Sequence, residues 1–172
     1  MYLRVAPELN LKRLVVGGFE QVFEINRNFR NEGMSTKHSP EFTMLEFYWA
    51  YHDYNDLMDL TEVLLKEVTQ SVLGTTSFTF QEKDIDLSKP IKRLTLIEAI
   101  LEFNPDIHAA ELEDAKSLAA LADKVNVEVE DHWGAGKLLM EIFEAVVEDK
   151  IEQPLFVTQH PAEVSPLSLI HI

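Results

Sequence analysis

Residues 19–30 read FEQVFEINRNFR and residues 42–51 read FTMLEFYWAY, and these two stretches decide the fold. In the first stretch Phe23, Ile25 and Phe29 alternate with polar side chains, which is the period of a strand with one apolar face. The second stretch is rich in aromatic residues, which favour strands. The segment between them is rich in Gly, Ser, Lys and His and predicts a loop. We therefore expect an antiparallel strand pair, joined by a loop of about nine residues that is longer than a hairpin needs and typical of a functional segment.

The second strand has two unlike faces, because successive side chains of a strand point in opposite directions. One face is almost wholly apolar and is expected to pack on the core; it carries Thr43, Leu45, Phe47, Trp49 and Tyr51. The other face includes a carboxylate and a phenol and is expected to lie open; it carries Phe42, Met44, Glu46 and Tyr48. On the first strand Asn28 and Arg30 occupy the polar face, and Glu32 continues their spacing into the loop.

If the two polar faces coincide, one surface of the sheet brings together a guanidinium, carboxylates and aromatic rings. Arginine offers a planar fork to a carboxylate or a phosphate, and an aromatic ring can stack on a base. A carboxylate suits an ammonium group. These groups together suit a ligand with phosphate, purine and cationic parts. The alternative is ordinary solvated surface, on which a cross-strand Arg–Glu pair contributes roughly a few tenths of a kcal/mol.

The rest of the chain is mostly helical. Apolar periods and capping signals predict helices at residues 7–15, 53–73, 95–103, 111–124 and 136–150. A second, smaller hairpin is expected at residues 77–80 and 84–87, and residues 154–158 predict a short apolar strand. This order favours the α+β class over βαβ alternation.

Composition and charge exclude several classes of protein. The 172 residues include 15 basic and 30 acidic ones, and a net charge of −15 argues against a nucleic-acid binder with a broad basic surface. Without cysteine there is no disulfide, thiolate zinc site or cysteine nucleophile. No apolar run approaches the roughly 18 residues that span a bilayer, and no signal-peptide core follows the first residues. We expect a cytoplasmic protein without membrane contact.

The charge is unevenly distributed along the chain. Residues 1–52 hold six basic and six acidic residues, whereas residues 53–153 hold nine basic residues against 23 acidic ones. A site is expected in the neutral segment, where arginine, glutamate and histidine are interleaved. The acidic segment is expected to be a solvated surface.

Two further motifs carry less information. Gly134-Ala-Gly136-Lys137 lacks the spacing and the Ser or Thr of a phosphate loop, and predicts the start of a helix. The six histidines show no zinc-binding spacing, so no metal ligand is expected in this chain. His38 lies in the long loop, where it could meet a phosphate.

FRNEG at residues 29–33, followed by HSPEFTMLE at residues 38–46, resembles motif 2 of the class II aminoacyl-tRNA synthetases. Flanking segments, among them MYLRVAPEL at residues 1–9 and QPLFVTQHPAEVSPL at residues 153–167, are similar to bacterial-type lysyl-tRNA synthetases. Related aspartyl and asparaginyl enzymes usually have Gln where Met44 stands. The fold implied is a partial class II aminoacyl-tRNA synthetase catalytic domain, with an antiparallel sheet flanked by helices.

The resemblance implies an ATP-binding group of four residues: Arg30, Glu32, His38 and Phe42. Arg30 would hold the α-phosphate and the amino-acid carboxylate, and would be the catalytic residue by stabilising charge during in-line attack. Glu32 would meet the adenine amino group, and Phe42 would stack on the adenine ring. His38 would approach the distal phosphates.

The resemblance also implies a lysine-binding group, formed by Glu8, Arg30, Glu46 and Tyr48. The two glutamates would pair with the ammonium groups of lysine, and which of them pairs with which stays open. Tyr48 would help to bind the lysine side chain.

Residues 1–167 are expected to form the partial domain, with a motif 2 core at 1–52, an acidic helical segment at 53–153 and a returning strand at 154–167. Residues 168–172 do not continue the family pattern and are expected to be a truncation artefact. The family's anticodon-binding domain, motif 1, magnesium carboxylates and motif 3 would lie outside the chain. The chain alone is therefore expected to be inactive.

The full enzyme implied is an ATP-dependent lysine–tRNA ligase that forms lysyl-adenylate and transfers lysine to tRNA(Lys). ATP would be a substrate, Mg²⁺ a cofactor, and a homodimer the assembly. Two alternatives stay open: a paralogue that ligates a lysine-like amino acid to a protein, and a non-catalytic binding module.

Overall fold

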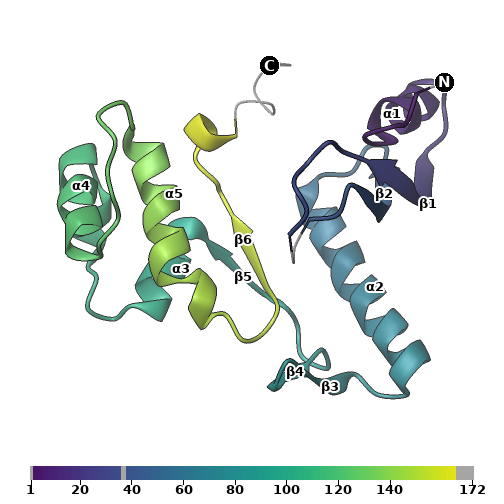
Figure 1. Cartoon of the computed structure of the whole chain (residues 1–172). Coiled ribbons are helices and arrows are strands. Elements are labelled where there is room, and N and C mark those ends of the chain that lie inside the picture. The colour runs from purple at the N-terminus through teal and green to yellow at the C-terminus, as the bar shows by residue number, and fades with distance from the viewer. Residues whose placement is uncertain (1, 36–37, 166–172) are drawn as a thin grey trace. The chain divides into compact units, whose positions relative to one another are not determined.

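The computed structural model describes residues 2–35 and 38–165, and the chain divides into two compact units, Met1–Leu57 and Met58–Ile172. Figure 1 shows the elements along the chain. The helices are α1 (Glu8–Val16), α2 (Tyr54–Leu73), α3 (Leu96–Phe103), α4 (Ala115–Lys124) and α5 (Ala135–Val146), with short 3-10 helices at Ala109–Leu112, Glu148–Lys150 and Ala162–Val164. The strands are β1 (Gln21–Phe29), β2 (Glu41–Trp49), β3 (Ser77–Phe80), β4 (Lys83–Asp86), β5 (Lys92–Thr95) and β6 (Leu155–Thr158).

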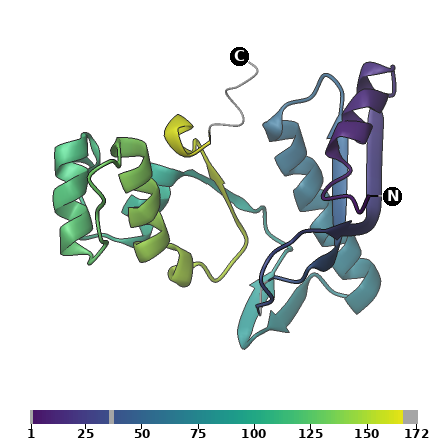
Figure 2. The same ribbon diagram turned by 45° about the horizontal axis from the view of Figure 1, so that its top comes forward.

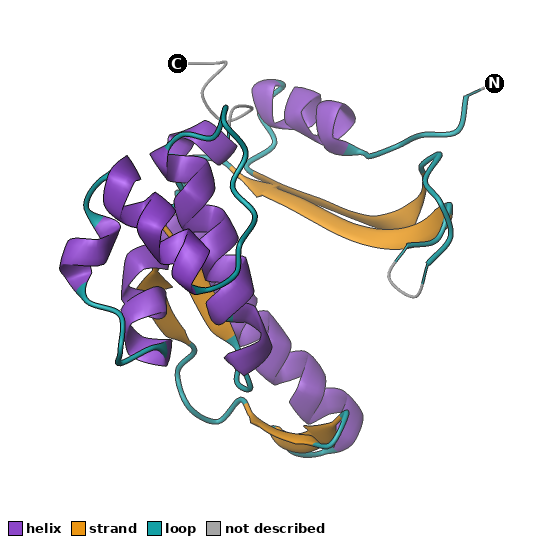
Figure 3. Cartoon of the chain, turned by 60° about the vertical axis from the view of Figure 1, so that its left-hand side comes forward, coloured by secondary structure: helices purple, strands orange, loops and turns teal. Residues whose placement is uncertain are grey.

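The first unit is built on a two-stranded ribbon. β1 and β2 pair antiparallel from Gln21 opposite Trp49 to Phe29 opposite Glu41, which confirms the expected strand pair. Helix α1 lies along this ribbon (Figure 3). In this register Glu24 faces Glu46 and Asn28 faces Phe42, so the two polar faces do coincide.

The expectation about which face is covered was wrong. On the apolar face Phe23 is 70% exposed and Ile25 is 62% exposed, and Leu45 is exposed as well. The opposite face is the covered one: Asn28 is fully buried, and Glu46 and Tyr48 are half-buried. The reason is that residues 2–7 and α1 cover the polar face, where Arg4 bonds to Glu24 and Lys12 lies over the Tyr48 ring. On the apolar face only Phe29, Phe47 and Trp49, toward its two ends, are half-buried.

The second unit holds an apolar core between helices and a small sheet. Its fourteen buried residues are Leu94, Leu96, Ala99, Ile100, Ile107, Leu112, Leu118, Leu121, Ala122, Leu138, Leu139, Ile142, Phe143 and Val147. Helices α4 and α5 lie side by side in it (Figure 2). β5 and β6 pair in parallel, whereas β3 and β4 form the expected antiparallel hairpin. The mixture of helices and small sheets agrees with the α+β class.

Two expected helices are shorter in the structure. The helix expected at residues 111–124 begins at Ala115, because the Asp114 side chain accepts hydrogen bonds from the backbone N–H groups of Lys116 and Ser117. The helix expected at 136–150 ends at Val146 and gives way to a 3-10 turn. By contrast, the cap expected at Thr95 is present as a full capping box with Glu98.

Within residues 2–35 and 38–165, no helix is both long and apolar enough to cross a bilayer. The expected truncation artefact at residues 168–172 lies outside the described residues, and the division of the chain at residues 52 and 153 stays a prediction.

Candidate active site

Arg30 and Phe42 lie at the two ends of the long loop and meet across the ribbon. The guanidinium carbon of Arg30 is 5.2 Å from the centre of the Phe42 ring, within the range of a cation–π contact. The backbone of Arg30 is fixed by a 3.0 Å hydrogen bond to the carbonyl of Pro40, and its side-chain Nε donates to the carbonyl of Val5 at 3.4 Å. A planar cation and an aromatic ring are thus presented together.

Glu46 and Tyr48 form a second pair on the same face of β2. The Tyr48 hydroxyl donates a hydrogen bond to the Glu46 carboxylate. Burial raises the pKa of Tyr48 well above its ordinary range, and the hydrogen bond and negative charge of Glu46 raise it further. Tyr48 therefore stays protonated and keeps its hydrogen bond at neutral pH.

Glu8 approaches this pair from the first turn of α1. Its carboxylate accepts a hydrogen bond from Lys12 at 2.5 Å, and the Lys12 ammonium lies 5.7 Å from the centre of the Tyr48 ring. The chain thus places one of its own ammonium groups between a carboxylate and an aromatic ring. An ammonium group is the ligand that the resemblance predicts for Glu8.

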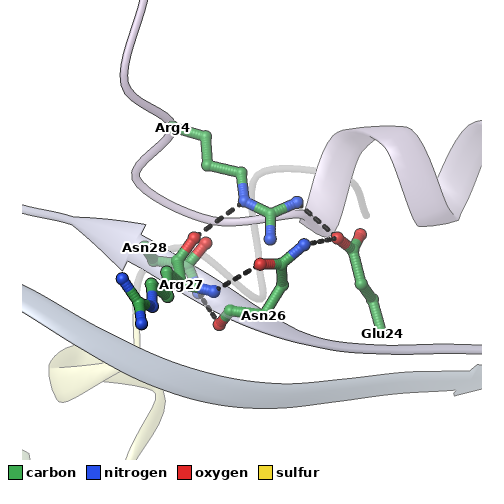
Figure 4. Close-up of polar contacts among 5 residues, drawn as sticks. All are labelled: Arg4, Glu24, Asn26, Arg27 and Asn28. Carbon is green, nitrogen blue, oxygen red and sulfur yellow. Dashed lines mark hydrogen bonds and ion pairs between the residues drawn. The ribbon is translucent and has the colours of Figure 1, made fainter.

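A polar network that the sequence did not reveal lies on the same face (Figure 4). Arg4 donates through Nε to the carbonyl of Arg27 at 3.0 Å and through Nη1 to Glu24 at 2.5 Å. Asn26 also donates to Glu24, at 3.0 Å. These bonds, with that of Arg4 first, hold the pKa of Glu24 below its ordinary value. Lone charged residues at 4 and 24 carry no motif, so no sequence signal points to their pairing.

Within the described residues, two buried polar atoms of this network have no hydrogen-bond partner: Nη2 of Arg4 and Oδ1 of Asn28. One atom is a donor and the other an acceptor, so one bound water that reaches both would satisfy the two.

The structure does not bring Glu32 and His38 to the other predicted residues. Glu32 is exposed in the loop. The Nδ1 atom of His38 lies 3.0 Å from the Ser35 hydroxyl. The backbone N–H of His38 donates to that hydroxyl, and the backbone N–H of Ser35 donates to the carbonyl of His38. Their predicted contacts with adenine and phosphate remain predictions.

Within the described residues, no three His, Asp or Glu side chains lie close enough to hold a metal ion. A shallow groove of about 450 Å³ runs along α2 between Val63 and Thr76 and contains none of the predicted site residues. Among the described residues, the ribbon face brings together a guanidinium over an aromatic ring and a carboxylate bonded to a phenol.

Comparison with known proteins identifies the family of the chain. Residues 1–171 match the family described as tRNA synthetases class II (D, K and N). A lysine–tRNA ligase of Idiomarina loihiensis is 57% identical over 171 residues, which are 99% of this chain and 34% of that protein. One from Pseudomonas aeruginosa is 59% identical over 168 residues, 98% of this chain and 34% of that protein.

The chain spans about a third of the length of these curated relatives. The match nevertheless covers both units, and it includes the ribbon with its guanidinium, ring and carboxylates. The chain belongs to the class II tRNA synthetases of the D, K and N group.

Proposed function

We propose that this chain supplies the motif 2 part of a lysine–tRNA ligase, which activates lysine with ATP to lysyl-adenylate and transfers it to tRNA(Lys). The observation that supports this most directly is the ribbon face, where Arg30 lies over Phe42 and the Glu46–Tyr48 pair stands on the same strand. The names of the relatives support lysine as the amino acid.

In this proposal Arg30 binds the α-phosphate of ATP and the carboxylate of lysine, which brings the attacking oxygen and the phosphorus together. Charge that develops on the phosphate during in-line attack is stabilised by the guanidinium. Phe42 stacks on adenine, Glu32 binds the adenine amino group, and His38 reaches the distal phosphates. Catalysis then rests on positioning and electrostatics.

The lysine subsite would be formed by Glu8, Glu46 and Tyr48. Two carboxylates match the two ammonium groups of lysine, and the phenol of Tyr48 holds one carboxylate in place. An uncharged side chain of equal length would leave a carboxylate unpaired, which is costly in a half-buried site.

Mg²⁺ is general to the family, but the described residues do not provide a carboxylate cluster that fits it. We therefore derive no step through the metal from this chain, and propose that its ligands belong to the remainder of the enzyme. We also propose that the full enzyme is a cytoplasmic homodimer. The protein-modifying paralogue and the non-catalytic module are the outcomes that the test must exclude.

The test is a chimera in which the matched third of the Idiomarina loihiensis ligase is replaced by this chain, compared with an Arg30→Ala version. We expect the chimera to charge tRNA(Lys) with lysine, and Arg30→Ala to reduce kcat/KM for pyrophosphate exchange by about 100-fold or more. Circular dichroism and gel filtration check that both proteins fold alike.

If the Arg30→Ala chimera charges tRNA(Lys) as fast as the parent chimera, the proposed role of Arg30 is wrong. A folded chimera that forms adenylate but transfers lysine only to protein would favour the paralogue. A folded chimera that binds neither ATP nor lysine by calorimetry would favour the non-catalytic module. In the isolated chain, pyrophosphate exchange near the rate of the full-length ligase would refute the expectation that it is inactive alone.

A further inference from the structure

We propose that Arg4 is a positioning residue for Arg30: it fastens residues 4 and 5 to the free edge of β1, so that the carbonyl of Val5 holds the Arg30 guanidinium over Phe42. The role depends on the proposed function, in which Arg30 binds ATP. The hydrogen bonds that link Arg4, Val5 and Arg30 all lie within the first unit and are observed independently of that function.

Arg4 is bound to β1 at three points. Its own carbonyl accepts a hydrogen bond from the backbone N–H of Phe29 at 2.8 Å. Its side chain donates to the carbonyl of Arg27 and to the carboxylate of Glu24, two residues on the same strand. Figure 4 shows the two side-chain contacts, from the Arg4 guanidinium to the carbonyl of Arg27 and to the carboxylate of Glu24.

The next residue makes the link to the catalytic arginine. The carbonyl of Val5 accepts from Nε of Arg30 at 3.4 Å, which is longer than an ideal hydrogen bond. Such a bond orients a side chain only when its acceptor is held still. Val5 is exposed, so the bonds of the preceding Arg4 are what hold its carbonyl in place.

The charge of Arg4 has a second effect on the same face. Glu24 lies directly opposite Glu46 in the register, which would put two uncompensated carboxylates side by side. Because Arg4 forms the ion pair with Glu24, Glu46 stays the carboxylate that is free to take a substrate ammonium, next to Tyr48.

A lysine side chain at position 4 could not make both of the hydrogen bonds that the Arg4 side chain makes. A guanidinium donates in two directions from fixed positions, here to a carbonyl and to a carboxylate, whereas an ammonium is a single point of charge on a flexible stem. Arg4→Lys is therefore expected to keep the ion pair with Glu24 and to lose the bond to Arg27. It separates the positioning effect from simple loss of charge.

The experiment has two arms. In the ¹⁵N-labelled, ligand-free chain, the side-chain Nε–H signal of Arg30, assigned by its loss in Arg30→Lys, is followed in Arg4→Met, Arg4→Lys and Arg27→Met. Arg27→Met is the matched control, because it removes the ion pair between Arg27 and Glu41 from the opposite face of the same ribbon. In the chimera, KM for ATP and kcat of pyrophosphate exchange are measured for the same variants.

We expect Arg4→Met to shift or broaden the Arg30 signal and to reduce kcat/KM for ATP about 10-fold, with Arg4→Lys between it and the parent. Arg27→Met should change neither readout by more than about twofold. An Arg30 signal that Arg4→Met leaves unchanged would overturn the proposal, as would equal losses in Arg4→Met and Arg27→Met. If Arg30→Ala changes neither KM for ATP nor kcat in the chimera, the proposed function fails. The Arg30 Nε–H signal of the ligand-free chain still decides whether Arg4 positions Arg30.

Discussion

The two units of the chain differ in the contacts that stabilise each of them. In the described part of the first unit only Pro7, Leu11 and Asn28 are buried, and the contacts that carry the ribbon face are hydrogen bonds and ion pairs. In the described part of the second unit, fourteen buried apolar residues pack together in one core. The unit with the candidate site thus has the smaller apolar core, so its stability should depend less on side-chain volume than that of the second unit.

A matched pair of substitutions gives the largest contrast. Ile142→Ala opens a cavity at a fully buried position of the second unit and should cost about 2–5 kcal/mol of unfolding free energy. Ile25→Ala makes the same change on the exposed face of the ribbon and should cost less than about 1 kcal/mol. Urea unfolding followed by circular dichroism measures both. Equal losses would show that the ribbon's apolar face is covered in solution.

A polar contact in the second unit tests whether its stability is apolar throughout. The Glu163 carboxylate accepts the backbone N–H groups of Gly134 and Gly136 at the start of α5, each at 2.9 Å. Glu163→Ala should therefore destabilise the chain by about 1 kcal/mol. Glu152→Ala, an exposed glutamate nearby in the sequence, should change the melting temperature little. A loss as large as that of Ile142→Ala would mean that the contrast between the units is overstated.

Acid should loosen the ribbon strand β1 before helix α5. The pKa of Glu24 is lowered in the folded chain by its bonds to Arg4 and Asn26. Its contribution is therefore complete above its ordinary pKa near 4.5 and is lost as the pH falls through the lower, folded-state pKa. Amide hydrogen exchange between pH 6 and pH 3, with each rate divided by the intrinsic rate at that pH, should show lower protection in β1 with acid, and Glu24→Gln should remove most of that dependence. Parallel loss in α5 would contradict the prediction.

The smallest expected effect concerns Lys12. Its ammonium competes for the Glu8 carboxylate, and exposed pairs of this kind contribute roughly 0.3–0.5 kcal/mol. Lys12→Met in the chimera should therefore strengthen lysine binding about twofold in calorimetry. Arg13→Met removes the same charge from α1 without touching Glu8 and should leave the affinity nearer that of the parent. Equal gains in both variants would point to net charge alone.

Sequence alone predicted the ribbon well and its surroundings poorly. Alternation at Phe23, Ile25 and Phe29 indicates a strand with two unlike faces, and the register of β1 with β2 agrees with it. Alternation does not say which face meets the rest of the chain, because that depends on where residues 2–7 are bound. Those residues are held by Arg4, whose side-chain partners Glu24 and Arg27 lie 20 and 23 positions away in the sequence.

The limits in the second unit have similar causes. β5 escaped prediction because Lys92 and Arg93 make its first half polar, and only its parallel pairing with β6 makes it a strand. The break before α4 could have been read from Asp114, a residue that favours the start of a helix. The hydrogen bond between Gly134 and Glu163 joins residues 29 positions apart, and the hydrophobic periodicity of a sequence cannot predict such a contact.

The pairing of β1 with β2 also governs which insertions and deletions the chain can tolerate. Because side chains alternate along a strand, adding or removing one residue within Glu41–Trp49 would turn the following side chains to the opposite surface. A single such event before Glu46 would turn Glu46 and Tyr48 away from the predicted ligand-binding face together. A length change confined to the loop after Arg30 and before Glu41 would, by contrast, leave the side chains of both strands on their present faces.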